Sequence, residues 1–188
     1  MGNLMNEDQF FRFCQINESV EFERDFKGNI VLLPLRGSHY SLLNLEISAE
    51  LWIWNEKNQS GLIFSSSTGF TLPNGAVRSP DVSWITNEKW NVLSREQQEV
   101  FAPICPDFVI EILSVQNESQ YLHDKMKEYI SNGTQLGWLI DFLNDKVFVY
   151  RADEELIIEN SLDIILPGEQ VLPGFQLNFE AIKNKIRV

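Results

Sequence analysis

The sequence has little of what several large classes of protein require. It holds only two cysteines, Cys14 and Cys105, which are too few for a disulfide framework and favour a reducing cytoplasm. No apolar run approaches the ~18 residues that a membrane-spanning helix needs. The first residues also lack the basic region and apolar stretch of a signal peptide. We therefore expect a cytoplasmic protein without a membrane anchor.

Basic residues are scarce as well. The chain has 15 Lys and Arg against 27 Asp and Glu, so its formal net charge is −12. This balance argues against non-specific nucleic-acid binding, which depends on cationic side chains that neutralise phosphates. It does not exclude a phosphate substrate held through a metal ion. We expect any binding of DNA to depend on divalent ions more than on a basic groove.

The length and composition are those of a globular protein. With 188 residues, 44% hydrophobic and 22% charged, the chain can build one sizeable core, and we expect a single domain over residues 1–188. The only histidines, His39 and His123, are far apart, so the sequence offers no cluster typical of a zinc site. We expect His39 near the start of a helix and His123 on a helix surface.

Hydrophobic periodicity and turn residues predict an α+β fold with a central mixed sheet flanked by helices. We expect helices over residues 7–15, 40–55, 90–100, 118–132 and 180–186. We expect strands within residues 20–35, which turn near 27–29, and within 61–72, 79–85, 105–114, 136–142, 146–152, 155–160 and 174–179. The helix at 40–55 has apolar residues around most of its circumference, so we expect it to be buried on several sides.

A glutamate interrupts the apolar strand "CPDFVIEILS", residues 105–114. Burying an unpaired charge is costly, so Glu111 needs a cation nearby. Asp107 shares its face of the strand but lies roughly 13 Å away at ~3.3 Å per residue, too far to share one ion. A neighbouring strand is only ~4.8 Å away, and "SPDVSWI" offers Asp81 there.

Two interpretations of this pair remain open. Carboxylates aimed at one point repel each other unless a cation lies between them, which is the signature of a divalent metal site. Alternatively, Asp81 caps a turn after Pro80, and Glu111 pairs with a buried lysine. The spacing alone favours the second interpretation.

The helix after this strand supplies the lysine. At ~100° per residue, Leu122, Met126 and Tyr129 form an apolar stripe, with Lys125 at its edge and Lys127 nearly opposite. Lys125 can therefore lean toward the sheet, or extend from the rim of the core into water. Lys127 is expected to face water.

Four segments together resemble the Uma2 family of restriction endonucleases. They are "GFTLPNGAVRSPDVSWI", "CPDFVIEILS", "KMKEYISNGTQLGWLID" and "LPGFQL", and the similarity runs in order from about Asp8 to Phe175. The resemblance implies a PD-(D/E)XK nuclease fold with a restriction-endonuclease-like core and metal-dependent hydrolysis of phosphodiester bonds.

The resemblance also implies roles for individual residues. Asp81 and Glu111 would be the acids that hold Mg²⁺ or Mn²⁺, with the backbone carbonyl of Ile112 as a further ligand. The usual lysine position of the superfamily holds Leu113 here, which is a departure, and Lys125 on the next helix takes its place. DNA is the expected substrate, and a homodimer is plausible because nucleases often cut both strands.

Three further acids are candidates for the site, and two further functions are compatible with the sequence. Glu50 and Glu46 on the long helix could join the site, although a solvated position at the rim of the core is preferred. Glu23 matches a family position and is given a salt-bridge or turn role. A catalytically inactive nuclease-fold binding module and a dimeric scaffold domain are the rival functions, and the sequence does not decide between DNA and RNA.

Overall fold

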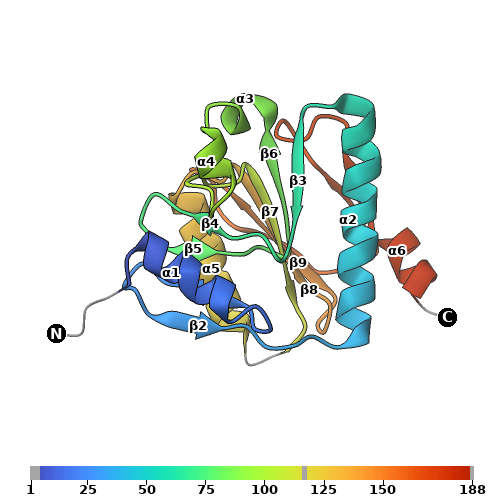
Figure 1. The fold of residues 1–188 in the computed structure, drawn as a ribbon. Helices are drawn as coiled ribbons and strands as arrows, with labels where there is room; N and C mark the ends of the chain where they lie inside the picture. Colours follow the sequence, from blue (N-terminus) through green and yellow to red (C-terminus); the bar gives the residue numbers. More distant parts are fainter. Residues whose placement is uncertain (1–4, 116–117, 187–188) are drawn as a thin grey trace.

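A six-stranded mixed sheet organises the protein, whose computed structural model describes residues 5–115 and 118–186 (Figure 1). In spatial order the strands are β10 (Ile157–Glu159), β9 (Lys146–Arg151), β8 (Leu136–Asp141), β7 (Phe108–Leu113), β6 (Val82–Thr86) and β3 (Gly61–Ser65). Only β7 and β8 run parallel, and every other neighbouring pair is antiparallel. The α+β fold with a mixed sheet is as the sequence predicts.

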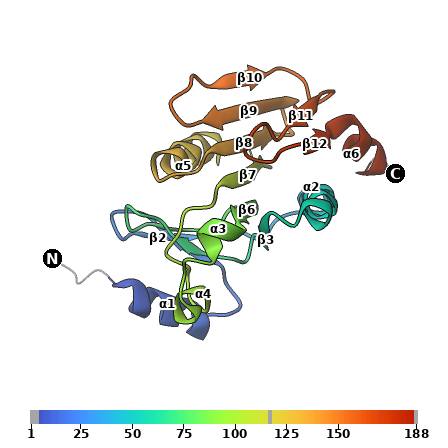
Figure 2. The same ribbon diagram turned by 90° about the horizontal axis from the view of Figure 1, so that it is seen from above.

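The two central strands are covered on both faces. Every residue of β7 and of β8 is buried, which explains why both read as continuous apolar runs rather than as alternating patterns. Helix α5 (Ser119–Ser131) connects them and packs on one face through Leu122, Met126 and Tyr129. Figure 2 shows α5 and α2 on opposite sides of the sheet.

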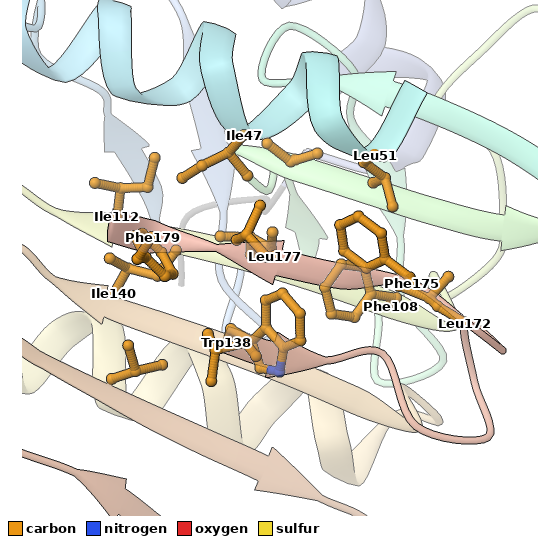
Figure 3. Packing of buried hydrophobic residues seen from close by; sticks show 14 of the residues in the cluster. Ile47, Leu51, Phe108, Ile112, Trp138, Ile140, Leu172, Phe175, Leu177 and Phe179 are labelled. Carbon is orange, nitrogen blue, oxygen red and sulfur yellow. The ribbon is translucent and has the colours of Figure 1, made fainter. Parts of the chain in front are cut away.

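The other face is covered by the long helix α2 (Ser38–Asn58), together with the hairpin β11 (Ile165–Pro167) and β12 (Gln176–Asn178) and the helix α6 (Phe179–Ile186). Figure 3 shows Ile47 and Leu51 of α2 above Phe108 and Ile112 of the sheet. The buried stripe of α2 repeats at helical spacing and consists of Leu43, Ile47, Leu51 and Trp54.

A second, smaller sheet lies beside the first. Its strands, in spatial order, are β2 (Ile30–Leu32), β1 (Phe22–Arg24), β5 (Val77–Arg78) and β4 (Phe70–Thr71). Helix α1 (Glu7–Ile16) packs beside it through the fully buried Phe10, whose ring lies under the guanidinium of Arg24. This sheet brings residues from the first 25 positions next to the strand that precedes β6.

The expected helix at 90–100 is wrong. Two short helices occupy the region instead, α3 (Asn87–Trp90) and α4 (Arg95–Gln98). Ser94 accepts a hydrogen bond from the N–H of Gln97, and the Gln97 side chain accepts one from the N–H of Ser94. This reciprocal capping box starts a new helix, which a continuous helix through Ser94 would not allow.

The expectation that α2 is buried on several sides is also wrong. Its remaining apolar side chains are about half exposed, namely Leu42, Leu45, Trp52 and Ile53. Composition around the helix suggested burial, whereas only the periodic stripe contacts the sheet. In the described part of the chain, no helix is long and apolar enough to span a bilayer.

We expect Gly61→Ala to lower the free energy of unfolding by about 1–3 kcal/mol, the usual range for overpacking. A Cβ at Gly61 would meet the carbonyl oxygen of Ile85 and the indole ring of Trp84 across the β3–β6 pair. The measurement is urea unfolding. The matched control is Gly37→Ser, since Gly37 caps α2 without a side-chain hydrogen bond and has no atom within 4 Å of its Cβ position. Equal loss in both variants would contradict the prediction.

Candidate active site

Asp81, the residue before β6, lies opposite Glu111 of β7. Strands β6 and β7 are antiparallel, with Val82 opposite Ile110, so one further residue along this register places Asp81 opposite Glu111. Both side chains are buried, with 9% of Asp81 and 2% of Glu111 exposed. The structure thus brings together the two acids that the sequence analysis paired.

The carboxylate of Asp81 is held from two directions. Its Oδ2 accepts a hydrogen bond of 2.7 Å from the backbone N–H of Ile112, and its Oδ1 accepts one from the hydroxyl of Tyr40 near the start of α2. Both partners are remote in sequence. They therefore fix Asp81 between β7 and α2, and they give no support to a simple turn cap after Pro80.

Lys125 lies between two acids. Its Nζ is 2.7 Å from Glu111 Oε1 and 2.7 Å from Glu23 Oε1, and it donates a hydrogen bond of 3.1 Å to the carbonyl of Ser79. Only 4% of Lys125 is exposed, whereas Lys127 is exposed to water. The orientations predicted for both lysines from helix geometry are confirmed, and Glu111 does pair with a buried lysine.

Glu23 belongs to the same cluster, which sequence reasoning recognised only as a salt-bridge or turn residue. It is fully buried and accepts hydrogen bonds from the N–H of Ser79, the hydroxyl of Tyr121 and the guanidinium of Arg78. Arg78 also pairs with Glu128 of α5, whose Oε2 lies 2.5 Å from its Nε. The only advance signal was the match of Glu23 to a family position, since β1 is too short to show a burial pattern.

Burial and charge set the ionisation of this cluster. Burial opposes ionisation of Glu23, but Lys125 and Arg78 outweigh it and lower the pKa of Glu23. Burial acts to lower the pKa of Lys125, yet Glu111 and Glu23 raise it above its ordinary value. Burial raises the pKa of Glu111 to about 8 against the effect of Lys125, with Asp81 adding repulsion. Burial likewise raises the pKa of Asp81, against the effects of Lys125 and of the hydrogen bond from Tyr40.

The donor chemistry of these acids fits a divalent cation. Two buried carboxylates with raised pKa values, on adjacent strands, are stabilised by a cation placed between them, and carboxylate oxygen is the ligand that Mg²⁺ prefers. Within residues 5–115 and 118–186, no three His, Cys, Asp or Glu side chains gather in a way that could hold a metal. The remaining ligands would have to be backbone oxygens or water. The carbonyl of Ile112 stays a prediction as such a ligand.

Other candidates lie outside the cluster. Glu46 and Glu50 each pair with Lys185 of α6 at 2.9 Å, so the long helix contributes no acid to the site. His39 is exposed in the first turn of α2, as expected. The prediction of a surface position for His123 needs correction, because its ring is half-buried against Phe148 and bonded to the hydroxyl of Tyr150.

The chain is similar to a known protein family and to a solved structure. The model of the Uma2 family, described as "Putative restriction endonuclease", matches residues 7–180. Among solved structures, the chain is similar to a protein of Anabaena variabilis ATCC 29413 described as "a putative nuclease belonging to DUF820", with a TM-score of 0.81 and 22% identity over 97% of this chain and 99% of that one. This likeness confirms the nuclease-type α+β fold.

A search of curated proteins found no match. Because the family model covers nearly the whole sequence, the chain belongs to the Uma2 family.

Proposed function

We propose that this protein is an endonuclease that hydrolyses phosphodiester bonds of DNA with Mg²⁺ or Mn²⁺. The observation that carries the proposal is the convergence of Asp81, Glu111 and Lys125, which come from two strands and a helix and are buried together beside one point. Membership of the Uma2 family and the similarity to a protein described as "a putative nuclease" support it. A homodimer and a cytoplasmic location remain further parts of the proposal.

Each residue of the proposed site has a role that follows from its chemistry. Asp81, Glu111 and the carbonyl of Ile112 would hold the ion, which when bound lowers the pKa of water and offsets negative charge on the phosphate. Tyr40 and the N–H of Ile112 orient Asp81 through its two oxygens. The raised pKa of Lys125 keeps its Nζ protonated. Lys125 is therefore poorly suited to act as a base, and its three N–H groups already bind Glu111, Glu23 and the carbonyl of Ser79. It would assist the attack by holding Glu111 in place and by offsetting negative charge on the phosphate.

A second candidate function rests on the same contacts. Lys125 is already paired with Glu111 and Glu23, and both oxygens of Asp81 already accept hydrogen bonds. These contacts would also suit a structural ion-pair network in an inactive binding module or scaffold. Cleavage assays with Mn²⁺ on supercoiled, linear and single-stranded DNA test the proposal. Intact DNA in every assay would favour the second candidate.

Metal should stabilise the wild type and fail to stabilise the site variants. Binding to the native state adds about 2.7 kcal/mol at a metal concentration 100 times Kd, so we expect Mg²⁺ or Mn²⁺ to raise the Tm of wild type. Asp81→Asn and Glu111→Gln should lose this response. Glu46→Gln is the matched control, since Glu46 pairs with Lys185 away from the site and should keep the response. A wild type indifferent to both metals would count against the proposal.

Substitutions of the two lysines of α5 should differ in their effect on DNA cleavage. We expect Lys125→Met to abolish cleavage and Lys127→Met to leave it nearly intact, because only Lys125 contacts the acids. Removing one partner of a buried pair typically costs about 3–5 kcal/mol, so folding of Lys125→Met must be checked by circular dichroism. A folded Lys125→Met that cuts at the wild-type rate would remove Lys125 from the mechanism.

Without metal, the free energy of unfolding should fall as the pH rises from the ordinary pKa of Glu111 to its raised pKa in the folded protein. Its pKa is 4.5 in the unfolded chain and about 8 in the folded protein, so between these values the native state binds more protons. The free energy of unfolding, measured in EDTA, should fall by at most about 1.4 kcal/mol per pH unit over this range. Glu111→Gln should flatten this slope. A wild type that gains stability over the same pH range would mean that Glu111 is ionised throughout.

A further inference from the structure

A cavity of about 470 Å³ lies next to Asp81, on the side of the sheet that α2 covers. It is bounded by the segment that leads into α2, the end of β7 and the turn after β8, and its lining includes Leu35, His39, Tyr40, Leu43, Ile112 and Phe142. Its volume lies in the range of about 300–1,000 Å³ that is typical of small-ligand sites. The cluster of Lys125 and its acids does not use this space.

Aromatic rings and a few polar groups line the cavity. The rings of His39 and Phe142 are in contact, with centroids 5.1 Å apart and planes tilted by 51°. The guanidinium of Arg36 lies 5.3 Å from the ring centroid of Tyr40 and is held by Glu118 at 2.6 Å. Apolar walls with aromatic faces and convergent polar groups suit a planar heterocycle that both stacks and forms hydrogen bonds.

The cavity shares two walls with the candidate active site. The hydroxyl of Tyr40 and the N–H of Ile112 both bind the carboxylate of Asp81, and both residues also line the cavity. A group inside the cavity would thus lie one side chain away from Asp81. Arg36 lies at the same opening, where Glu118, which also lines the cavity, binds its Nη1. A guanidinium has five N–H donors, so Arg36 is also suited to a ligand attached to phosphates.

We infer that this cavity holds a single unpaired nucleobase of the DNA, next to the phosphodiester bond presented to Asp81 and Glu111. The inference rests on the proposed function and narrows its substrate to single-stranded or locally unpaired DNA. A base within a duplex is stacked and paired, and extracting it costs a few kcal/mol. An unpaired base enters without that cost and gains stacking on the aromatic walls.

An apolar peptide or a second copy of the chain is the competing occupant, since Leu35 and Leu143 are exposed at the cavity. A nucleotide is favoured for two reasons. The cavity continues directly into the wall that holds Asp81, and it carries Arg36 and His39 beside its aromatic rings. Neither feature is needed to bury leucine side chains.

Leu35→Glu and Leu32→Glu form a matched pair for the test. Leu32 ends β2 and Leu35 lies three residues further on. Both side chains are exposed and both changes add one negative charge, but of the two only Leu35 lines the cavity. The probes are a fluorescein-labelled single strand, the matching duplex, and that duplex with a central unpaired bubble. Binding is measured by anisotropy with Ca²⁺ in place of Mg²⁺ to prevent cleavage. His39→Ala, at an exposed position, removes one ring.

We expect wild type to bind the single strand and the bubble about tenfold or more tighter than the duplex, in line with stacking of one base. Leu35→Glu and His39→Ala should lose this preference, and Leu32→Glu should keep it. Equal affinity of wild type for all three probes would overturn the base site and leave the metal-dependent nuclease standing. No binding of any probe would overturn DNA as the substrate, and the base site with it.

Two further outcomes also decide against the base site. If Leu35→Glu and Leu32→Glu weaken binding equally, the added charge acts generally and the cavity is not involved. If size-exclusion chromatography shows that Leu35→Glu alone dissociates an oligomer while DNA preference is unchanged, the cavity is an interface between copies of the chain. Each of these outcomes would reject a nucleobase as its occupant.

Discussion

The arrangement of the site depends on one buried cation, the ammonium group of Lys125. It joins β1, β7 and α5, because its Nζ lies 2.7 Å from both Glu23 and Glu111. Without it, the carboxylates of Glu23 and Glu111 would be buried at close range, and of these two Glu23 would keep its ion pair with Arg78. Removing one partner from such a buried group costs far more than removing a surface charge. The ion pairs therefore both position the acids and fix the small sheet against α5.

The sequence left two interpretations of Glu111 open, a metal site and a buried ion pair, and the structure is compatible with both. Glu111 pairs with a buried lysine and also faces Asp81 across the β6–β7 pair. Negative charge is in excess around them, since Arg78 is shared between Glu23 and Glu128. A cluster of this kind balances its charge by retaining a proton or by admitting another cation. The observed ion pair and the proposed metal site are thus compatible uses of one cluster, and the raised pKa of Glu111 links them.

The sequence predicted those parts of the site that depend on local periodicity. Strand alternation and strand spacing brought Asp81 to Glu111, and the angular position on a helix separated Lys125 from Lys127. Tyr40 and Arg78 were missed, because their partners lie 41 and 55 residues away and meet them only when α2 and the small sheet dock. The same limit explains the mistaken burial of α2. Composition shows that a helix is apolar, but tertiary packing decides which faces are covered.

The two faces of the sheet offer a substrate different chemistry. On the side of α5 lie Lys125, Arg78 and Glu23, whose buried charges are paired with one another and offer little to a planar base. On the side of α2 lies a cavity of aromatic and apolar walls. Asp81 stands between them, held by Tyr40 on one side and influenced by Lys125 on the other. A nucleotide has the same division into charged phosphate and planar base. In the proposed function, its two halves would therefore match the two sides of Asp81 better than a uniformly apolar or uniformly charged ligand.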